Sequence, residues 1–438
     1  MRVGILGFGY IGSVIGAVVA SKGYEVIGFE KDERILECIK NEKSPFNEVG
    51  LEELLKSSIK NGNLIITEEY KNIALCDVLI VTVGTPLKEN YSADNSQIIQ
   101  AINSIKDYLK DETLVILKST VPPNTTKDIV APMLEQINGL KLAFSPERLA
   151  EGKAIQEFLS LPIIVGGIND ESTEAACTFW REVLDVEVHG LSNSTTAEMV
   201  KLADNLWIDL NIALANELAK LSDKLNIDVL EVITAANTLP KGSKGQHVNI
   251  LTPSMGVGGY CLTKDPWFVQ KLGEEYEIDL FLPKNGRKVN DTMPSYTVGL
   301  IKENLARLNK ENEEITIAIM GISFKNNTSD CRFSPTKYVI EELIQSNYNV
   351  KICDPWTNLS DELLVTNLPV SKDIKETIRN VDCVAFLAGH KEFYDLTVEE
   401  LSNLTNTGAL IIDGRMFYSR EFISELRKKG LNYKGIGR

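Results

Sequence analysis

The hydrophobic residues in the first part of the chain fall into short unbroken runs separated by stretches with helical spacing. A run from Val3 to Leu6 meets the glycine-rich sequence GFGYIG, a small-residue helical pattern follows, and a second run, EVIGFE, ends in Glu30. This order predicts a strand, a helix and a second strand. Similar patterns predict further strands at 77–86, 112–123, 140–146 and 161–167, with helices around 98–110 and 126–136. We therefore expect a doubly wound α/β domain reaching to about residue 195.

From Thr195 the pattern becomes one long helical repeat. Apolar residues recur at spacings of three and four over residues 195–227 and lie on more than one side of the expected helix. A helix of this kind usually forms the spine of a domain, a subunit interface, or both. We expect it to pair subunits, giving a homodimer or a higher homo-oligomer.

The last third of the chain repeats the strand–helix–strand order. The expected strands lie at 314–325, 349–355, 381–389 and 408–415, with an amphipathic helix at 333–348. The first loop, GISFKNNTSDCR, lacks GxGxxG, so it should hold a different phosphate ligand, gripped by Lys325 and Arg332. The predicted fold is α/β, with two Rossmann-like doubly wound domains (1–195 and 306–438) joined by a central helical domain with one long helix (196–305).

Composition narrows the class of protein. The 438 residues include 61 acidic and 46 basic side chains, and the net charge of −15 argues against a nucleic-acid or anionic-membrane partner. No apolar run approaches the length of a membrane span, and no signal peptide is apparent. Seven scattered cysteines without CxxC spacing, and only three histidines, predict neither a disulfide framework nor a metal site. We expect a cytoplasmic enzyme.

The first predicted loop carries a dinucleotide-binding pattern. Its candidate cofactor-binding residues are Gly7, Gly9, Tyr10, Ile11 and Gly12. The motif follows a strand and opens a helix, and Glu30 comes 18 positions after its last glycine. Glycines allow a pyrophosphate to approach the backbone, while an acid at that position binds a ribose diol and repels a 2′-phosphate. The pattern predicts NAD as the cofactor; a tight turn without a ligand is the alternative.

Polar residues follow several of the predicted strands. Because ligands of such sheets gather at the carboxyl ends of the strands, the candidates there are Thr85, Ser119, Thr120, Glu147 and Glu151. We expect Thr85, Ser119 and Thr120 to contact the cofactor.

The sequence GYCLTKDP places Cys261 in a glycine-rich loop. A cysteine beside apolar residues is more often part of a core than a nucleophile. Here the glycines at 256, 258 and 259 indicate a turn with room for a ligand, Lys264 can favour the thiolate, and Asp265 can take a proton.

Three polar residues of the long helix share one face, because Glu198, Lys201 and Asn205 are spaced at i, i+3 and i+7. On an isolated helix they would form a solvated stripe with a Glu–Lys pair. Beside a pocket, Lys201 and Asn205 could donate hydrogen bonds to an oxyanion.

Together these motifs resemble the UDP-glucose/GDP-mannose dehydrogenase family of nucleotide-sugar 6-dehydrogenases. The resemblance covers essentially the whole chain and keeps its order through GFGYIG, VGTP, KST, SPERLAEG, AEMVKLADN, GVGGYCLTKDP and GISFKNNTSDCRFSP. It implies two successive NAD-dependent oxidations that convert the C6 alcohol of a UDP-sugar to a carboxylate without release of the aldehyde. The product would be a precursor of capsule or another surface polysaccharide.

The resemblance also implies roles for individual residues. Cys261 would form a thiohemiacetal and then a thioester, Lys201 and Asn205 would stabilise oxyanions, and Asp265 would assist with water and proton movements. Glu151 would be the base for thioester hydrolysis. The remaining implied contacts are Thr120 and Glu147 to water, Lys264 and Arg332 to the cofactor, and Glu147, Leu149, Lys201, Asn205, Gly258 and Lys325 to the substrate.

Two departures from the family pattern stand out. Thr263 occupies a position before Lys264 that is often proline, and the loop before the glycines lacks the arginine that commonly reaches a neighbouring subunit's substrate. Lys241, Lys244 and His247 are what this loop offers instead.

Alternatives stay open for the sugar of the substrate and for the class of protein. The sequences NIALANELAKL and VNDTMP resemble the branch that oxidises UDP-N-acetylhexosamines, so UDP-N-acetylglucosamine or UDP-N-acetylmannosamine is favoured over UDP-glucose, and GDP-mannose is more distant. A 3-hydroxyacid dehydrogenase would share the N-terminal fold and a catalytic lysine but would not need the cysteine loop. A non-catalytic NAD-sensing protein would not need Cys261, Lys201 and Asp265.

Overall fold

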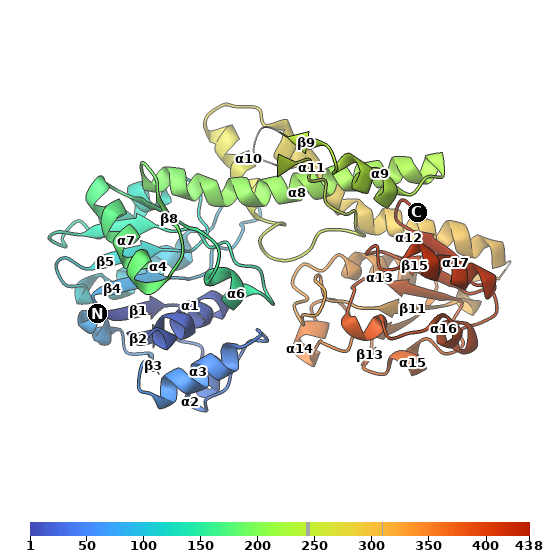
Figure 1. Ribbon diagram of the computed structural model, residues 1–438, viewed down its shortest axis with the longest axis horizontal. Helices are drawn as coiled ribbons and strands as arrows, with labels where there is room; N and C mark the ends of the chain where they lie inside the picture. Colours follow the sequence, from blue (N-terminus) through green and yellow to red (C-terminus); the bar gives the residue numbers. More distant parts are fainter. Residues whose placement is uncertain (242–245, 309) are drawn as a thin grey trace. The chain divides into compact units, whose positions relative to one another are not determined.

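The computed structural model describes residues 1–241, 246–308 and 310–438 (Figure 1). The chain divides into two compact units, Met1–Asp204 and Asn205–Arg438. The boundary falls within one long helix, α8 (Ser194–Leu225), which matches the helix expected at 195–227. The finer division into three domains stays a prediction.

The first unit is built on one sheet with the strand order β3-β2-β1-β4-β5-β6-β7-β8. Strands β1 to β6 are parallel, whereas β7 runs antiparallel to β6 and β8 runs parallel to β7. The strands are β1 (Arg2–Leu6), β2 (Glu25–Phe29), β3 (Leu64–Thr67), β4 (Val78–Val81), β5 (Leu114–Leu117), β6 (Lys141–Phe144), β7 (Ile163–Gly167) and β8 (Val188–Gly190). Because β1 lies between β2 and β4, the strand order reverses there, and the β1 loop opens at the point where such sheets bind ligands.

Helices cover both faces of this sheet. Along β4, Val78 and Ile80 join the core under α1 and α7, while Leu79 and Val81 join the core under α4. Continuous apolar runs are what strands buried on both faces require. The helices are α1 (Tyr10–Ser21), α2 (Glu33–Lys40), α3 (Leu51–Lys60), α4 (Ser96–Ile105), α5 (Ala131–Met133), α6 (Ala154–Phe158) and α7 (Asp170–Val183), with 3₁₀-helices η1 (Tyr70–Leu75) and η2 (Lys106–Tyr108) and the π-helix η3 (Thr125–Val130).

The second unit contains an all-parallel sheet with the order β13-β12-β11-β14-β15-β16. Counted along the chain, this is the 3-2-1-4-5-6 order of dinucleotide-binding domains. Along β11, Ile317 and Ile319 face a core shared with α8, α9, α12 and α13, whereas Ala318 and Met320 face the core under α16 and α17.

The strands of this unit are β9 (Pro240–Lys241), β10 (Gln246–His247), β11 (Thr316–Met320), β12 (Asn349–Cys353), β13 (Val370–Ser371), β14 (Cys383–Phe386), β15 (Leu410–Asp413) and β16 (Asn432–Gly435). Its helices are α9 (Val229–Ala236), α10 (Asp265–Glu275), α11 (Phe281–Asp291), α12 (Met293–Leu305), α13 (Thr336–Gln345), α14 (Leu359–Glu362), α15 (Ile374–Thr377), α16 (Val398–Leu404) and α17 (Arg420–Lys428), with 3₁₀-helices η4 (Ala306–Leu308), η5 (Asn312–Glu314) and η6 (Lys391–Phe393).

The predicted fold class is confirmed, and one expected helix differs. The stretch 126–136 is the π-helix η3 followed by the single turn of α5. Pro132 stands at the start of α5 and cannot donate an N–H to an α-helix continuing from η3, which accounts for the change. No helix within the described ranges combines the length and apolar character needed to cross a membrane.

Candidate active site

The loop after β1 has the geometry of a pyrophosphate-binding turn. Gly7 has a φ of +90°, which favours glycine. A Cβ at Gly12 would lie 2.1 Å from the carbonyl oxygen of Gly7, so only glycine allows α1 to pack this closely. A Cβ at Gly9 would meet nothing within 4 Å. The backbone at Gly9 is therefore open to a ligand at the start of α1, where Tyr10 and Ile11 form the first turn.

Glu30 follows β2 and lies beside this loop. Its Oε2 accepts a hydrogen bond from the Phe8 N–H at 2.8 Å, and its Oε1 accepts from the Lys31 N–H at 2.8 Å. A carboxylate held at the end of the second strand, next to an open glycine turn, is the arrangement that a ribose diol requires. The residues present therefore fit NAD.

The loops after β4 and β5 are joined by two hydroxyl groups. Thr85 Oγ1 donates to the carbonyl of Thr120 at 2.6 Å, and Ser119 Oγ donates to the carbonyl of Val83 at 2.6 Å. The sequence-predicted Thr85, Ser119 and Thr120 are thus brought together at one edge of the sheet.

Glu147 follows β6 and is buried. Its Oε1 accepts from the Leu149 N–H at 2.5 Å, while its Oε2 has no hydrogen-bond partner in the described structure. Lys118, which the sequence analysis did not single out, donates to the carbonyl of Pro146 at 3.4 Å and lies over the Trp180 ring at 5.2 Å. Burial lowers the pKa of Lys118, and Lys201 lowers it further, whereas Glu147 opposes the shift. The buried Lys118 therefore feels the charges of both Glu147 and Lys201.

A second missed residue, Glu48, connects the cofactor loop with the loop that carries Glu151. It is buried, and it accepts hydrogen bonds from the Tyr10 hydroxyl, from the Gly152 N–H at 2.6 Å and from the Ala154 N–H at 2.9 Å. Burial and the Glu48 carboxylate raise the pKa of Tyr10 well above its usual value. The segment PFNEVGL contained no pattern that would have identified Glu48 in the sequence.

The polar face of α8 is not a solvated stripe. Glu198 is fully buried, and Lys201 and Asn205 are each 7% exposed. Glu198 accepts from the N–H groups of Asn124 and Thr126, both at 2.7 Å, and from the Thr126 hydroxyl at 2.6 Å. Burial raises the pKa of Glu198 to about 7 despite these donors. Glu198 thus accepts hydrogen bonds from the first residues of η3 and its N-cap, and it does not pair with Lys201.

Asn205 connects α8 to the cysteine loop through a hydrogen bond to Asp265. Its Nδ2 donates to Asp265 Oδ2 at 2.5 Å, and Lys264 Nζ donates to Asp265 Oδ1 at 2.5 Å. Both members of the Lys264–Asp265 pair are buried. The Asp265 N–H also donates to the Cys261 carbonyl at 2.9 Å, which fixes the loop against the first turn of α10.

Cys261 differs from every other cysteine in the chain. It is exposed, whereas Cys38 is half-buried and the others are buried. Burial raises the pKa of each of the five buried thiols, Cys76, Cys177, Cys331, Cys353 and Cys383. Buried neutral thiols are poor nucleophiles, so Cys261 is the cysteine suited to covalent chemistry.

The cysteine loop packs against the loop that carries Lys325 and Arg332. A Cβ at Gly258 would lie 2.5 Å from the Phe324 Cβ, and one at Gly259 would lie 2.6 Å from the Phe324 ring. The Gly259 N–H donates to the Arg332 carbonyl at 3.1 Å. The Arg332 side chain pairs with Asp330. The structure therefore brings Gly258, Cys261, Lys325 and Arg332 onto adjoining loops of one unit.

The loop that lacks the expected arginine is only partly described. Lys241 and His247 are exposed and lie on the hairpin β9–β10, whereas Lys244 lies outside the described residues. Among the residues that the structure describes, no group of three or more His, Cys, Asp or Glu side chains could hold a metal ion.

Comparison with known proteins agrees with this geometry. Residues 1–184 match the NAD-binding domain of the UDP-glucose/GDP-mannose dehydrogenase family, residues 195–292 its central domain, and residues 318–420 its UDP-binding domain. The chain belongs to this family. It is therefore an NAD-dependent oxidoreductase of nucleotide sugars, and the 3-hydroxyacid dehydrogenase alternative is wrong.

Individual relatives cover the full chain. It is 34% identical to UDP-N-acetyl-D-mannosamine dehydrogenase of Methanococcus aeolicus, over 100% of this chain and 95% of the relative. It is 29% identical to UDP-glucose 6-dehydrogenase of Rickettsia typhi, over 100% and 99%. The structure of UDP-D-ManNAc dehydrogenase from Pyrococcus horikoshii superposes with a TM-score of 0.89 at 30% identity, over 100% of this chain and 99% of that one.

Proposed function

We propose that the chain oxidises the C6 alcohol of a UDP-N-acetylhexosamine to the carboxylate, with UDP-N-acetylmannosamine as the favoured substrate. The relatives named for that sugar support this choice, since the M. aeolicus relative is 34% identical and the R. typhi UDP-glucose enzyme 29%. UDP-N-acetylglucosamine and UDP-glucose are the alternative substrates.

The observation that carries the proposal is the exposed thiol of Cys261 in a loop fixed by Asp265 and packed on Phe324. The Cys261 sulfur adds to the C6 aldehyde to form a thiohemiacetal, and after the second oxidation it holds the acyl group as a thioester that water cleaves. Covalent capture keeps a reactive aldehyde from diffusing away.

NAD, held by the Gly7–Gly12 loop and Glu30, supplies the hydride acceptor for each of the two oxidations. Lys264 and Arg332 complete the proposed cofactor contacts. Lys264 forms an ion pair with Asp265 in the structure, so it also fixes the Asp265 carboxylate.

The other residues act on the sugar and on water. Lys201 and Asn205, one turn apart on α8, supply donors for the oxyanions, and Asp265 moves protons with Lys201. Glu151 is the proposed base for thioester hydrolysis. The proposed substrate and water contacts are Thr120, Glu147, Leu149, Gly258 and Lys325.

We also propose that α8 pairs two copies of the chain. Trp207, Leu214 and Leu221 recur every seven residues and are 51%, 47% and 57% exposed. Heptad spacing places them on one stripe, the pattern that helix pairing buries. Replacing Leu214 and Leu221 by Glu should convert the dimer to a monomer in light scattering, whereas the same change at Lys224 should not; unchanged mass would reject α8 as the interface.

The free thiols favour a reducing, cytoplasmic location, and a uronic acid nucleotide suits the synthesis of a surface polysaccharide.

The test measures NADH formed per mole of sugar nucleotide at completion, for UDP-N-acetylmannosamine, UDP-N-acetylglucosamine and UDP-glucose separately. We expect two NADH with one sugar, and a loss of about 10³-fold or more in steady-state turnover for Cys261→Ala. Cys38→Ala, which removes another thiol that is not fully buried, should leave turnover unchanged. One NADH per sugar, or full turnover without the Cys261 thiol, would reject the covalent mechanism.

A further inference from the structure

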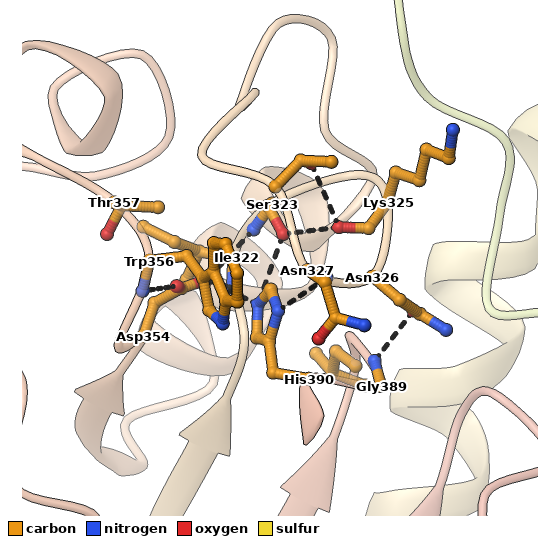
Figure 2. Close-up of polar contacts among 12 residues, drawn as sticks. Ile322, Ser323, Lys325, Asn326, Asn327, Asp354, Trp356, Thr357, Gly389 and His390 are labelled. Atoms are coloured by element: carbon orange, nitrogen blue, oxygen red, sulfur yellow. Dashed lines mark hydrogen bonds and ion pairs between the residues drawn. The ribbon is translucent and has the colours of Figure 1, made fainter. Parts of the chain in front are cut away.

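The loop that carries Lys325 is fastened by the residues that follow β14. Asn326 Oδ1 accepts from the Gly389 N–H at 2.8 Å, Asn327 Oδ1 accepts from the Lys391 N–H at 2.8 Å, and the Asn327 N–H donates to His390 Nδ1 at 2.9 Å. Figure 2 shows His390 beneath this loop and the Lys325 side chain extending away from it. The loop is therefore held at its backbone, and its lysine projects outward.

The hydrogen bonds assign one tautomer to His390. Because Nδ1 accepts the Asn327 N–H, it carries no proton, and the proton must be on Nε2. Nε2 lies 3.1 Å from Asp354 Oδ2 and 3.2 Å from Ser323 Oγ, whose own proton is donated to the Lys325 carbonyl at 2.8 Å, so Asp354 and Ser323 Oγ share the Nε2 proton as acceptors. The fully buried imidazole is thus neutral and transmits its hydrogen bond to the backbone of Lys325.

Asp354, directly after β12, faces the same ring nitrogen as Ser323. Its Oδ2 lies 3.1 Å from His390 Nε2 and accepts from the Ile322 N–H at 2.7 Å and the Ser323 N–H at 3.2 Å. The Trp356 ring stacks on the imidazole with centroids 6.2 Å apart (Figure 2). His390 therefore connects the start of the loop, held by Asp354, with its end at Asn327.

We propose that His390 is a positioning residue for the UDP-sugar: its neutral imidazole sets the conformation of the 321–327 loop and so places the Lys325 ammonium for the diphosphate. This inference rests on the proposed function, which assigns Lys325 to the sugar nucleotide. A lysine is a compact charge on a flexible stem, so its hold on a phosphate depends on where the backbone places it.

Two substitutions separate the two ring nitrogens. In His390→Gln the side-chain amide can donate in place of Nε2, but no acceptor remains for the Asn327 N–H. In His390→Asn the side-chain oxygen takes the place of Nδ1 and keeps that bond. We expect His390→Gln to raise the Kd for UDP and the KM for the UDP-sugar by about tenfold, with kcat and the KM for NAD within about twofold; His390→Asn should stay within about threefold of wild type.

A double-mutant cycle tests whether His390 acts through Lys325. Lys325→Met should weaken UDP binding in calorimetry, and His390→Gln should add little to that loss. Should the single Lys325→Met change leave UDP affinity intact, the assignment of Lys325 in the proposed function is wrong. A weakened Lys325→Met variant with unchanged affinity in His390→Gln, or additive losses in the double variant, would overturn the role of His390.

If His390→Gln does not fold, Ser323→Ala tests the same role with a smaller change, because it interrupts the same chain of hydrogen bonds. Ser323→Ala should weaken UDP binding about threefold, and unchanged binding would again overturn the role of His390.

Discussion

The first six strands of the two Rossmann-like sheets have the same order, but the acidic residue after the second strand has different surroundings in each. Glu30 is partly exposed beside the open Gly9 backbone and accepts hydrogen bonds from the N–H groups of Phe8, Lys31 and Asp32. Asp354 is fully buried, and the Ile322, Ser323 and Trp356 N–H groups and His390 surround it. The same topological position thus borders an open glycine turn in one unit and is enclosed by its loop in the other.

The loops explain the difference. In the first unit, glycines leave the backbone open, so a ligand can occupy the space beside Glu30. In the second, the side chains of Ser323, Asn326 and Asn327 hold the loop, and the proposed ligand contact is the Lys325 ammonium. A shared fold therefore does not predict a shared ligand, and the site residues must be argued one by one.

The largest expected effect is a difference in the free energy of unfolding between variants of the two acids, Asp354 and Glu30. Asp354→Asn leaves an amide facing backbone N–H donors, so at least one buried N–H loses its acceptor, and we expect unfolding free energy to fall by about 3 kcal/mol. Glu30→Gln should change it by less than about 1 kcal/mol, because the exposed side of Glu30 can be hydrated. Denaturant titration of both variants measures this. Equal losses would show that both acids are structural.

The fold could be predicted from the sequence, and so could Glu30 as a candidate site residue, whereas the surroundings of Asp354 could not. Unbroken apolar runs such as 78–81 and 409–412 indicate strands buried on both faces, and Glu30 is identified by its distance from a glycine motif that has a known ligand. These signals are local, so an order of elements and an NAD site follow directly from them.

His390 could not be predicted in the same way. It lies 36 residues from Asp354 and 63 from Asn327, and only parallel pairing of β11 with both β12 and β14 brings the three together. A weak signal existed, since His390 follows a buried strand at the edge where polar residues gather. The surroundings of Glu198 stayed open in the sequence for a related reason: its helix face is solvated unless another segment covers it, and the residue that does so, Thr126, lies 72 residues earlier.

A second, smaller effect contrasts two buried carboxylates with opposite pKa shifts. Glu198 has a pKa raised to about 7 by burial, so the folded state holds its proton more tightly than the unfolded chain, and stability falls as pH rises from about 4.5 to about 7. Burial also raises the pKa of Asp354, but the His390 and backbone donors outweigh it and lower the net value, so its contribution is lost only as pH falls through that value.

Glu198→Gln, which mimics the protonated carboxyl, isolates this effect. Relative to the variant, wild type should lose about 2 kcal/mol of unfolding free energy between pH 5 and pH 8. Glu217→Gln, an exposed change on the same helix, should follow wild type at both pH values. A constant difference between wild type and Glu198→Gln would mean that Glu198 is ionised throughout this range.

The smallest expected effect concerns the cofactor and tests whether Glu30 serves a ligand at all. A carboxylate beside the ribose repels the 2′-phosphate of NADP and accepts from the 2′-hydroxyl of NAD, so Glu30→Gln should raise the ratio of kcat/KM for NADP over NAD by about tenfold. Glu37→Gln removes the same charge from an exposed position on α2 and should leave the ratio unchanged, which separates a local contact from a general charge effect. An unchanged ratio in Glu30→Gln would mean that Glu30, like Asp354, only supports its loop. The two units would then differ only in the glycines of the loop after their first strand.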